Sequence, residues 1–147
     1  MNRGDVWVIS SREKASDLSG SIVDANHPVS VISGNQSANV PLFNKWNNYI
    51  AETEIPTKAF GKTYHVPLVH NRKYSPVIRI FAKDNNTEVF ADGKSIGTIN
   101  DNKFYIDYRF NKDAEASIGV ISSDKAIRVV LYNTGIEEEN NPSVNGS

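Results

Sequence analysis

A β-hairpin is predicted by the stretch Thr87-Glu88-Val89-Phe90-Ala91-Asp92-Gly93-Lys94-Ser95-Ile96-Gly97-Thr98-Ile99. Its two halves, 87–91 and 94–99, are rich in β-branched and apolar residues and flank the pair Asp92-Gly93. A two-residue type I′ turn needs positive φ at both central positions, and Asp-Gly is one of the pairs that adopt it most readily. This hairpin signal indicates antiparallel β-structure at the centre of the chain.

Further segments on both sides of this hairpin are also typical of strands. Val77–Ala82 is nearly continuously apolar, which favours a central strand covered on both faces. Lys103–Phe110 alternates, and Phe104, Ile106, Tyr108 and Phe110 share one face. Asparagine occurs 17 times and favours tight turns between short strands. The ten predicted strands are Val6–Ser10, Gly20–Asp24, Val29–Gly34, Tyr64–Val66, Val77–Ala82, Thr87–Ala91, Lys94–Ile99, Lys103–Phe110, Ala116–Ser122 and Ile127–Tyr132.

One phrase occurs twice in the chain, about a hundred residues apart. Residues 25–32, Ala-Asn-His-Pro-Val-Ser-Val-Ile, resemble residues 123–130, Ser-Asp-Lys-Ala-Ile-Arg-Val-Val. Each copy follows a strand-like stretch and predicts a strand, a polar turn and a β-branched strand. We therefore expect two similar hairpins near the two ends of the domain.

These patterns together predict an all-β domain, a β-sandwich or jelly-roll-like barrel of about ten short, mostly antiparallel strands. One short helix is an alternative within residues 44–54, where Trp46, Tyr49, Ile50 and Thr53 recur at helical spacing. Residues 1–135 are expected to form a single β domain. Residues 136–147 have no apolar period and are expected to be a linker-like tail.

Composition restricts the classes of partner. The chain has 147 residues, a net charge of −1 and no cysteine. A near-neutral chain lacks the basic face that nucleic acid or an anionic membrane surface requires. No apolar run is long enough for a membrane span. The first residues do not read as a signal peptide, so we expect the chain to be one domain of a larger protein.

Several motifs, in order, resemble one known family. The resemblance lies in Asp17-Leu18-Ser19-Gly20-Ser21-Ile22, in 27–34, in Asn39-Val40-Pro41 with Glu52 and Pro56, in 60–68, in Arg79 with Ala82, in Asp84-Asn85-Asn86-Thr87 and in Ser123-Asp124-Lys125-Ala126-Ile127. This order is similar to the N-terminal domain of the IgG Fc-binding protein family, which includes mucus-associated proteins and their bacterial and animal relatives. The resemblance covers about residues 16–132 and implies an extracellular binding module.

Two positions depart from the pattern of that family. Its members commonly carry a cysteine after the Ser-Gly phrase and a second one before the Glu-Pro stretch. The resemblance places Ser37 and Asn47 at these positions, as expected if a disulfide is absent as a pair. The lack of both cysteines fits a low-disulfide setting such as a bacterial surface.

No motif in the chain indicates catalysis. Gly-x-Ser-x-Gly and glycine-rich phosphate loops are absent from the sequence. His65 and His70 lack a third ligand for zinc, and turn chemistry explains Asp84-Asn85-Asn86 better than calcium does. We therefore expect no enzyme activity, no cofactor and no bound metal.

The candidate ligand-binding residues are aromatic and basic side chains in the irregular middle of the chain. Aromatic side chains in loops bind sugars and peptides because their rings stack on the ligand and bury a large contact area. The predicted loops are 43–49 and 70–74, with Trp46, Tyr49, Arg72 and Tyr74 as ligand contacts. The alternative is that Trp46 fills one end of a sandwich and Tyr49 packs beneath it.

Two functions follow from the sequence. The first is a non-catalytic extracellular or cell-surface adhesion module that binds a glycan, a mucin or a host protein. The second is a structural spacer or assembly domain within a larger surface protein.

Overall fold

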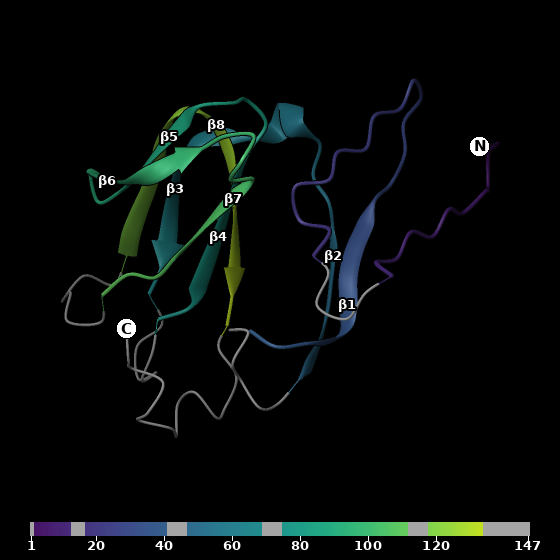
Figure 1. Cartoon of the computed structure of the whole chain (residues 1–147), viewed down its shortest axis with the longest axis horizontal. Coiled ribbons are helices and arrows are strands. Elements are labelled where there is room, and N and C mark those ends of the chain that lie inside the picture. Colours follow the sequence, from purple (N-terminus) through teal and green to yellow (C-terminus); the bar gives the residue numbers. More distant parts are fainter. Residues whose placement is uncertain (1, 13–16, 41–46, 69–74, 112–117, 134–147) are drawn as a thin grey trace.

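The computed structural model describes residues 2–12, 17–40, 47–68, 75–111 and 118–133. The described residues form eight strands and one short 3-10 helix at Thr57–Ala59, which confirms the predicted all-β class (Figure 1). The strands are β1 (Ile32–Ala38), β2 (Asn48–Thr53), β3 (Gly61–Pro67), β4 (Val77–Ala82), β5 (Thr87–Ala91), β6 (Lys94–Ile99), β7 (Tyr105–Tyr108) and β8 (Ile118–Tyr132).

Six of these strands form one antiparallel sheet that curls into a nearly closed barrel. The strand order is β6-β5-β8-β4-β7, and β3 pairs with β8 outside this path. The two ends of the order are consecutive in the chain, because a tight turn from Asn100 to Lys103 connects β6 to β7. A Cβ atom at Gly97 of β6 would lie 3.4 Å from Cδ1 of Ile106 on β7, so the two end strands approach each other. The predicted sandwich-or-barrel fold is therefore realised as a barrel-like sheet.

The hydrophobic core fills the inside of this barrel. Alternate residues of the central strand β4 point inward, and Ile78 and Ile80 are fully buried. Their neighbours from other strands are mainly β-branched residues, which pack well on a pleated sheet. The predicted central position of Val77–Ala82 is confirmed, because β4 pairs with β7 on one side and β8 on the other. The other buried core residues are Val66, Val89, Ala91, Ile99, Ile106, Phe110, Ile121 and Ile127.

The hairpin of β5 and β6 has the predicted bounds and the predicted turn. Asp92 has φ of 46° and Gly93 has φ of 76°, as a type I′ turn requires. Asp92 also binds the neighbouring strand: its N–H donates to the carbonyl of Val120 at 2.9 Å, and its Oδ1 accepts from the N–H of Val120 at 2.8 Å. The turn is thus fixed both by its own backbone and by β8.

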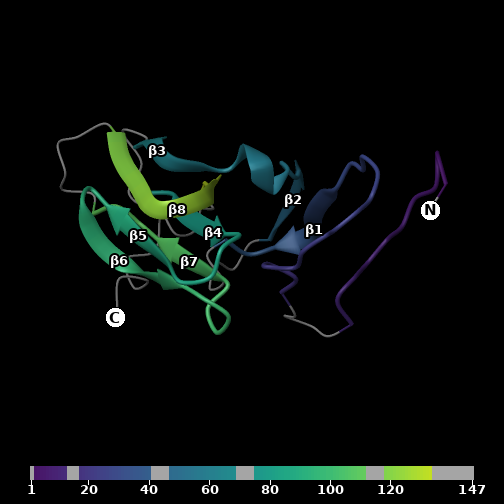
Figure 2. The same cartoon turned by 90° about the horizontal axis from the view of Figure 1, so that it is seen from above.

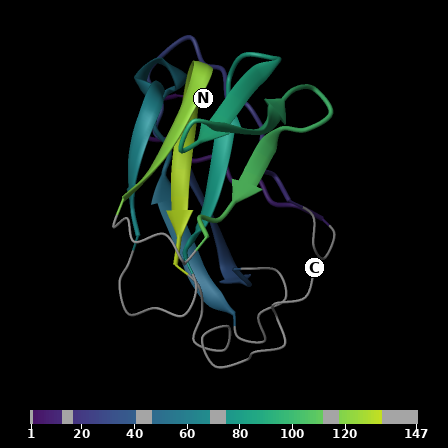
Figure 3. The ribbon, with the colours of Figure 1, turned by 90° about the vertical axis from the view of Figure 1, so that its left-hand side faces the viewer.

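The second of the two similar hairpins predicted from the repeated phrase is wrong, because residues 118–132 form one continuous strand. β8 runs between β3 on one side and β5 followed by β4 on the other (Figure 3). Ser123-Asp124-Lys125-Ala126 forms an irregularity opposite β3, where Gly61 pairs with Ile127 and Thr63 pairs with Ser122. These four residues therefore lie where β8 changes its neighbour from β5 to β4, and they do not form a turn that reverses the chain.

Neighbouring segments satisfy the polar groups of this phrase. Oδ1 of Asp124 accepts from the N–H of Glu88 at 2.8 Å, and its carbonyl accepts from Nζ of Lys62 at 2.6 Å. Nζ of Lys125 donates to the carbonyls of Asn85 and Asn86 at 2.6 and 3.0 Å. The Ser-Asp-Lys phrase thereby holds the turn before β5 in place.

The N-terminal part of the chain departs most from prediction. β1 pairs with β2 in a separate two-stranded sheet. Neither Val6–Ser10 nor Gly20–Asp24 is a strand, so the first of the two similar hairpins is also wrong. The alternative helix is wrong over 48–53, because these residues pair with β1 in an antiparallel ladder. Figures 1 and 2 show this hairpin beside the barrel, on the side where the N-terminal segment lies.

Candidate binding surface

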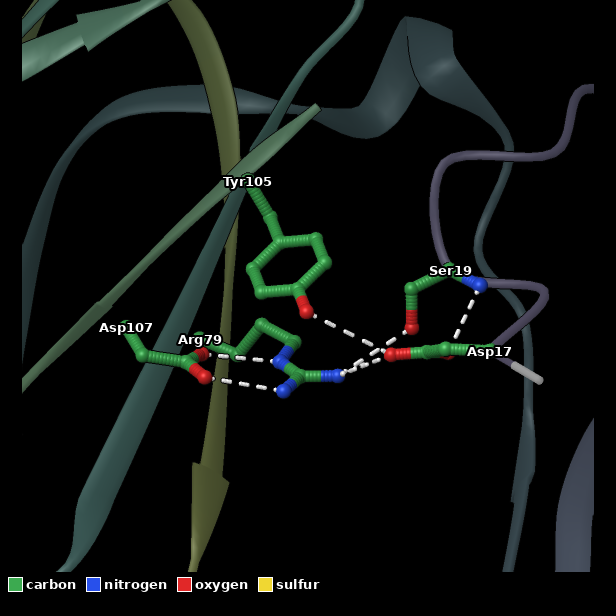
Figure 4. A network of polar contacts seen from close by, with 5 residues as sticks. All are labelled: Asp17, Ser19, Arg79, Tyr105 and Asp107. Atoms are coloured by element: carbon green, nitrogen blue, oxygen red, sulfur yellow. Dashed lines mark hydrogen bonds and ion pairs between the residues drawn. The ribbon is translucent and has the colours of Figure 1, made fainter. Parts of the chain in front are cut away.

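The guanidinium group of Arg79 is the centre of a polar network on the outside of the barrel (Figure 4). Arg79 on β4 lies opposite Asp107 on β7. Its Nε and Nη2 donate to Oδ1 and Oδ2 of Asp107, each at 2.8 Å. Its Nη1 donates to Oδ2 of Asp17 at 3.1 Å and to Oγ of Ser19 at 3.2 Å. One side chain thus joins two strands of the barrel to the N-terminal segment.

Tyr105 forms one wall of this network. The guanidinium carbon of Arg79 lies 4.0 Å from the centre of the Tyr105 ring, a cation–π geometry. The Tyr105 hydroxyl donates to Oδ2 of Asp17 at 3.4 Å, and the ring packs against Phe81 with centroids 5.9 Å apart. The aromatic ring therefore shields the ion pairs from water on one side.

A local turn places Asp17 and Ser19 against Arg79. Oδ1 of Asp17 accepts from the N–H of Ser19 at 2.9 Å, and the carbonyl of Leu18 accepts from the N–H of Ser21 at 3.0 Å. Gly20 has φ of +90°, and a Cβ atom there would lie 2.8 Å from Cβ of Phe104. Glycine permits both the backbone conformation and the close approach to Phe104, the residue before β7. The Asp-Leu-Ser-Gly motif is thus a docking turn.

Burial and charge act in opposite directions on the acid of this turn. Partial burial tends to raise the pKa of Asp17, but the hydrogen bonds from Ser19 and the charge of Arg79 outweigh it, so this pKa lies below its usual value. The hydrogen bonds to Asp107 are the main cause that raises the pKa of Arg79 further above its usual value. Burial raises the pKa of Tyr105. The network is therefore a set of paired charges near neutral pH.

A second arginine joins the β1–β2 hairpin to the barrel. Arg128 on β8 is buried, with 8% of its surface exposed. Its Nη2 donates to Oε1 of Glu52 at 3.0 Å, and its Nη1 pairs with Oε2 of Glu54. Ser33 on β1 donates from Oγ to Oε1 of Glu54. Ion pairs and hydrogen bonds therefore hold the inner face of the hairpin to the barrel.

The polar groups around these two arginines bind one another, which gives them a structural role. Each carboxylate described above accepts from an arginine, and each arginine has at least two acceptors. Among the described residues, His, Asp and Glu side chains form no group of three that could hold a metal ion. In the same part of the chain, no helix has the length and hydropathy of a membrane-spanning segment.

The outer face of the β1–β2 hairpin is open to solvent. Glu52 points toward the barrel, so alternation along β2 places Tyr49, Ala51 and Thr53 on the opposite face. The register adds Ile32, opposite Thr53, and Gly34, opposite Ala51. The exposed fractions of Tyr49 and Ile32 are 73% and 72%. We call these five residues the outer face.

The structure places one of the four predicted ligand contacts. Tyr49 lies on β2 within the outer face and is exposed, so the alternative in which Tyr49 packs in the interior is wrong. Trp46, Arg72 and Tyr74 lie outside the described residues and stay predictions. Ile32 was not predicted to be a surface residue. The spacing of two between Glu52 and Glu54 could have indicated that β2 is a strand with one charged face.

Two residues that replace the cysteines common in the family contact each other. They are Ser37 and Asn47. Nδ2 of Asn47 donates to Oγ of Ser37 at 2.7 Å. The two residues lie near the end of the ladder, where Ala38 pairs with Asn48. A hydrogen bond therefore occupies the place of a possible cross-link between β1 and β2.

Comparisons with known proteins give one match. The family model described as IgGFc binding protein matches residues 1–146. Neither the curated proteins nor the solved structures contain a match to this sequence. The motifs that suggested the family from sequence, including Asp17–Ile22 and Arg79, meet in the network of Figure 4.

Proposed function

Because the chain belongs to the IgGFc binding protein family, we propose that it is a non-catalytic extracellular module that binds other proteins. The family model covers nearly the whole chain, and this observation carries the proposal. The family resemblance also favours an extracellular or cell-surface location. No catalytic motif in the sequence competes with this function.

The outer face of the β1–β2 hairpin supports a site for the protein ligand. It presents two exposed apolar side chains, the aromatic ring of Tyr49 near one end of the ladder and the aliphatic side chain of Ile32 at the other. Tyrosine is enriched where proteins bind each other, because it offers a large contact area at a small cost in side-chain entropy. The charged inner face holds the hairpin in place through Arg128, so the outer face is presented on a fixed support.

Binding to a panel of extracellular ligands tests this function. The whole chain is passed over immobilised immunoglobulin Fc, mucins, other extracellular proteins and glycans. We expect binding to at least one protein, with a loss of about tenfold or more in affinity for Tyr49→Ala, the size expected for an aromatic contact at an interface centre. Phe104→Ala, which removes an exposed aromatic ring that is not part of the outer face, is the control, with its fold checked by circular dichroism because Phe104 lies next to the Gly20 turn.

The outcomes separate the candidate ligands. Binding to mucins that glycosidase treatment abolishes would assign a glycan as the ligand. Binding that Tyr49→Ala leaves unchanged would move the site to the predicted loops, where Trp46→Ala is the next variant. A folded chain that binds nothing on the panel would contradict the proposal and favour a spacer or assembly domain.

A further inference from the structure

We propose that the segment Val6–Ile9 of one copy of this chain adds as a strand to the free edge of β1 in a second copy. The domain would then assemble through its N-terminal part. This inference does not depend on the ligand binding proposed above. It follows from two features of the described part of the chain, an apolar segment that pairs with no strand there and a small sheet in which β1 has only β2 as a neighbour.

The segment Val6-Trp7-Val8-Ile9 has the composition of a strand and is not in a sheet. Its four residues are β-branched or aromatic, which is the composition that favours strands. Trp7 is 71% exposed and Val8 is 81% exposed. Among the described residues these four form no backbone hydrogen bond, so their polar groups face solvent. A run of four exposed apolar residues marks an interaction site.

The β1–β2 sheet offers a matching edge. Within the described part of the chain, β1 pairs only with β2. An isolated two-stranded sheet is marginally stable in water, and its edge presents unpaired N–H and C=O groups. A third strand beside β1 would satisfy these groups. Because side chains alternate, two of the four added side chains would lie beside Ile32 and extend the apolar outer face.

The placement of the segment favours a second copy as the partner. Figures 1 and 2 show the N-terminal segment on the far side of β1 from the barrel, running outward and separate from its own sheet. Each copy carries both a donor strand and an acceptor edge, so two copies can exchange strands and close a two-fold dimer. The net charge of −1 produces little repulsion between copies.

Sedimentation velocity of the whole chain, over a range of micromolar concentrations, tests the proposal. We expect a concentration-dependent dimer that Val8→Pro weakens by about tenfold or more in Kd, because proline removes an N–H from the added strand. Ile22→Pro is the matched control, since Ile22 and Val8 are both 81% exposed and both lie outside strands. Both positions are exposed, so we expect both variants to keep the fold.

Hydrogen exchange of the backbone amides provides the second measurement. Residues 6–9 and β1 should become protected together as the concentration rises, and Val8→Pro should remove that protection. A monomer at every concentration would overturn the proposal, as would a dimer that Val8→Pro leaves intact. Protection of 6–9 that does not change with concentration would also overturn it, because the segment would then pair within its own chain.

Discussion

Arg79 on β4 and Asp107 on β7 are cross-strand neighbours whose side chains are joined by two parallel hydrogen bonds of 2.8 Å each. This geometry uses the planar guanidinium group in a way that lysine cannot reproduce. The remaining amino group of Arg79 binds the Asp17 turn. The pair therefore fixes one barrel edge and provides the anchor for the N-terminal segment.

Arg79→Lys should lower the free energy of unfolding by about 1–2 kcal/mol, because one ammonium group cannot satisfy Asp107 and Asp17 together. Urea denaturation followed by circular dichroism measures the change. Arg12→Lys, at an exposed position outside the strands, is the control and should have little effect. In a double-mutant cycle with Asp107→Asn, the two losses should not add. Additive losses would show that the bidentate pair contributes no coupling.

The lowered pKa of Asp17 gives its ion pair a defined pH dependence. A carboxyl whose pKa is lower in the folded state than in the unfolded state contributes stability above its unfolded value of 3.8. That contribution is lost as the pH falls through the folded pKa. Asp17→Asn should therefore reduce stability by about 1 kcal/mol at neutral pH, and this difference should shrink as the pH falls below about 4.

Urea denaturation of wild type and Asp17→Asn at a series of pH values tests this dependence. Asp24→Asn is the control, because Asp24 is an exposed carboxylate in the same N-terminal region. A difference between wild type and Asp17→Asn that stays constant down to the lowest pH would show that the charge of Asp17 has no part in docking the turn.

Sequence predicted the elements whose signals are local. The Asp92-Gly93 turn depends on the φ angles of two adjacent residues, and β4 was predicted from its nearly continuous apolar run, so both were found with correct bounds. The inward-facing Ile78 and Ile80 are fully buried, whereas the other residues of β4 are half-buried. The Ser123-Asp124-Lys125 phrase also has the composition of a turn. Its polar groups are satisfied by Glu88, Lys62 and the Asn85 turn, which are distant in sequence. No local rule could distinguish that outcome from a hairpin.

The candidate sites also depend on contacts between segments that are distant in sequence, which local patterns do not predict. The family resemblance singled out Asp17, Ser19 and Arg79 as separate motifs, but their convergence depends on the docking of the N-terminal segment against β4. Tyr49 was predicted as a ligand contact in a loop or a helical turn. Its exposure instead follows from the pairing of β2 with β1, because the side chain alternates with Glu52.

Gly119 and Phe110 provide a test of packing at one end of the barrel. Phe110 is buried, and a Cβ atom at Gly119 would overlap its ring. Phe110 also packs edge-on against Tyr108, with centroids 5.2 Å apart, so the ring has little room to move. Gly119→Ala should therefore lower the free energy of unfolding by about 1–3 kcal/mol, as overpacking does.

Thermal and urea denaturation of Gly119→Ala measure this effect. Gly61→Ala on the neighbouring strand β3 is the control, since a Cβ atom there would make only ordinary contact, 3.4 Å from the Tyr64 hydroxyl. Adding Phe110→Leu to Gly119→Ala should cost less than Phe110→Leu costs in the wild type. If Gly119→Ala had wild-type stability, the Phe110 ring would be able to move aside at no cost in free energy.

The contact between Ser37 and Asn47 predicts that a disulfide can join β1 to β2. Nδ2 of Asn47 lies 2.7 Å from Oγ of Ser37, and the natural sequence contains no cysteine that could compete. The double variant Ser37→Cys and Asn47→Cys should oxidise to one intramolecular disulfide. Closing a loop of this length should stabilise the hairpin by about 2–3 kcal/mol in the chain-entropy model.

Thiol titration and hydrogen exchange check the two parts of this prediction. The oxidised double variant should show no free thiol under denaturing conditions, and the amides of β1 and β2 should exchange more slowly than in the reduced form. Ser37→Cys alone is the control, because it changes the same strand without a partner. Two free thiols after mild oxidation would contradict the β1–β2 register at this end. The contact lies at the irregularity between Asn35 and Ala38, so the disulfide tests the pairing of β1 with β2 at the end of the ladder where the chain leads from one strand to the other.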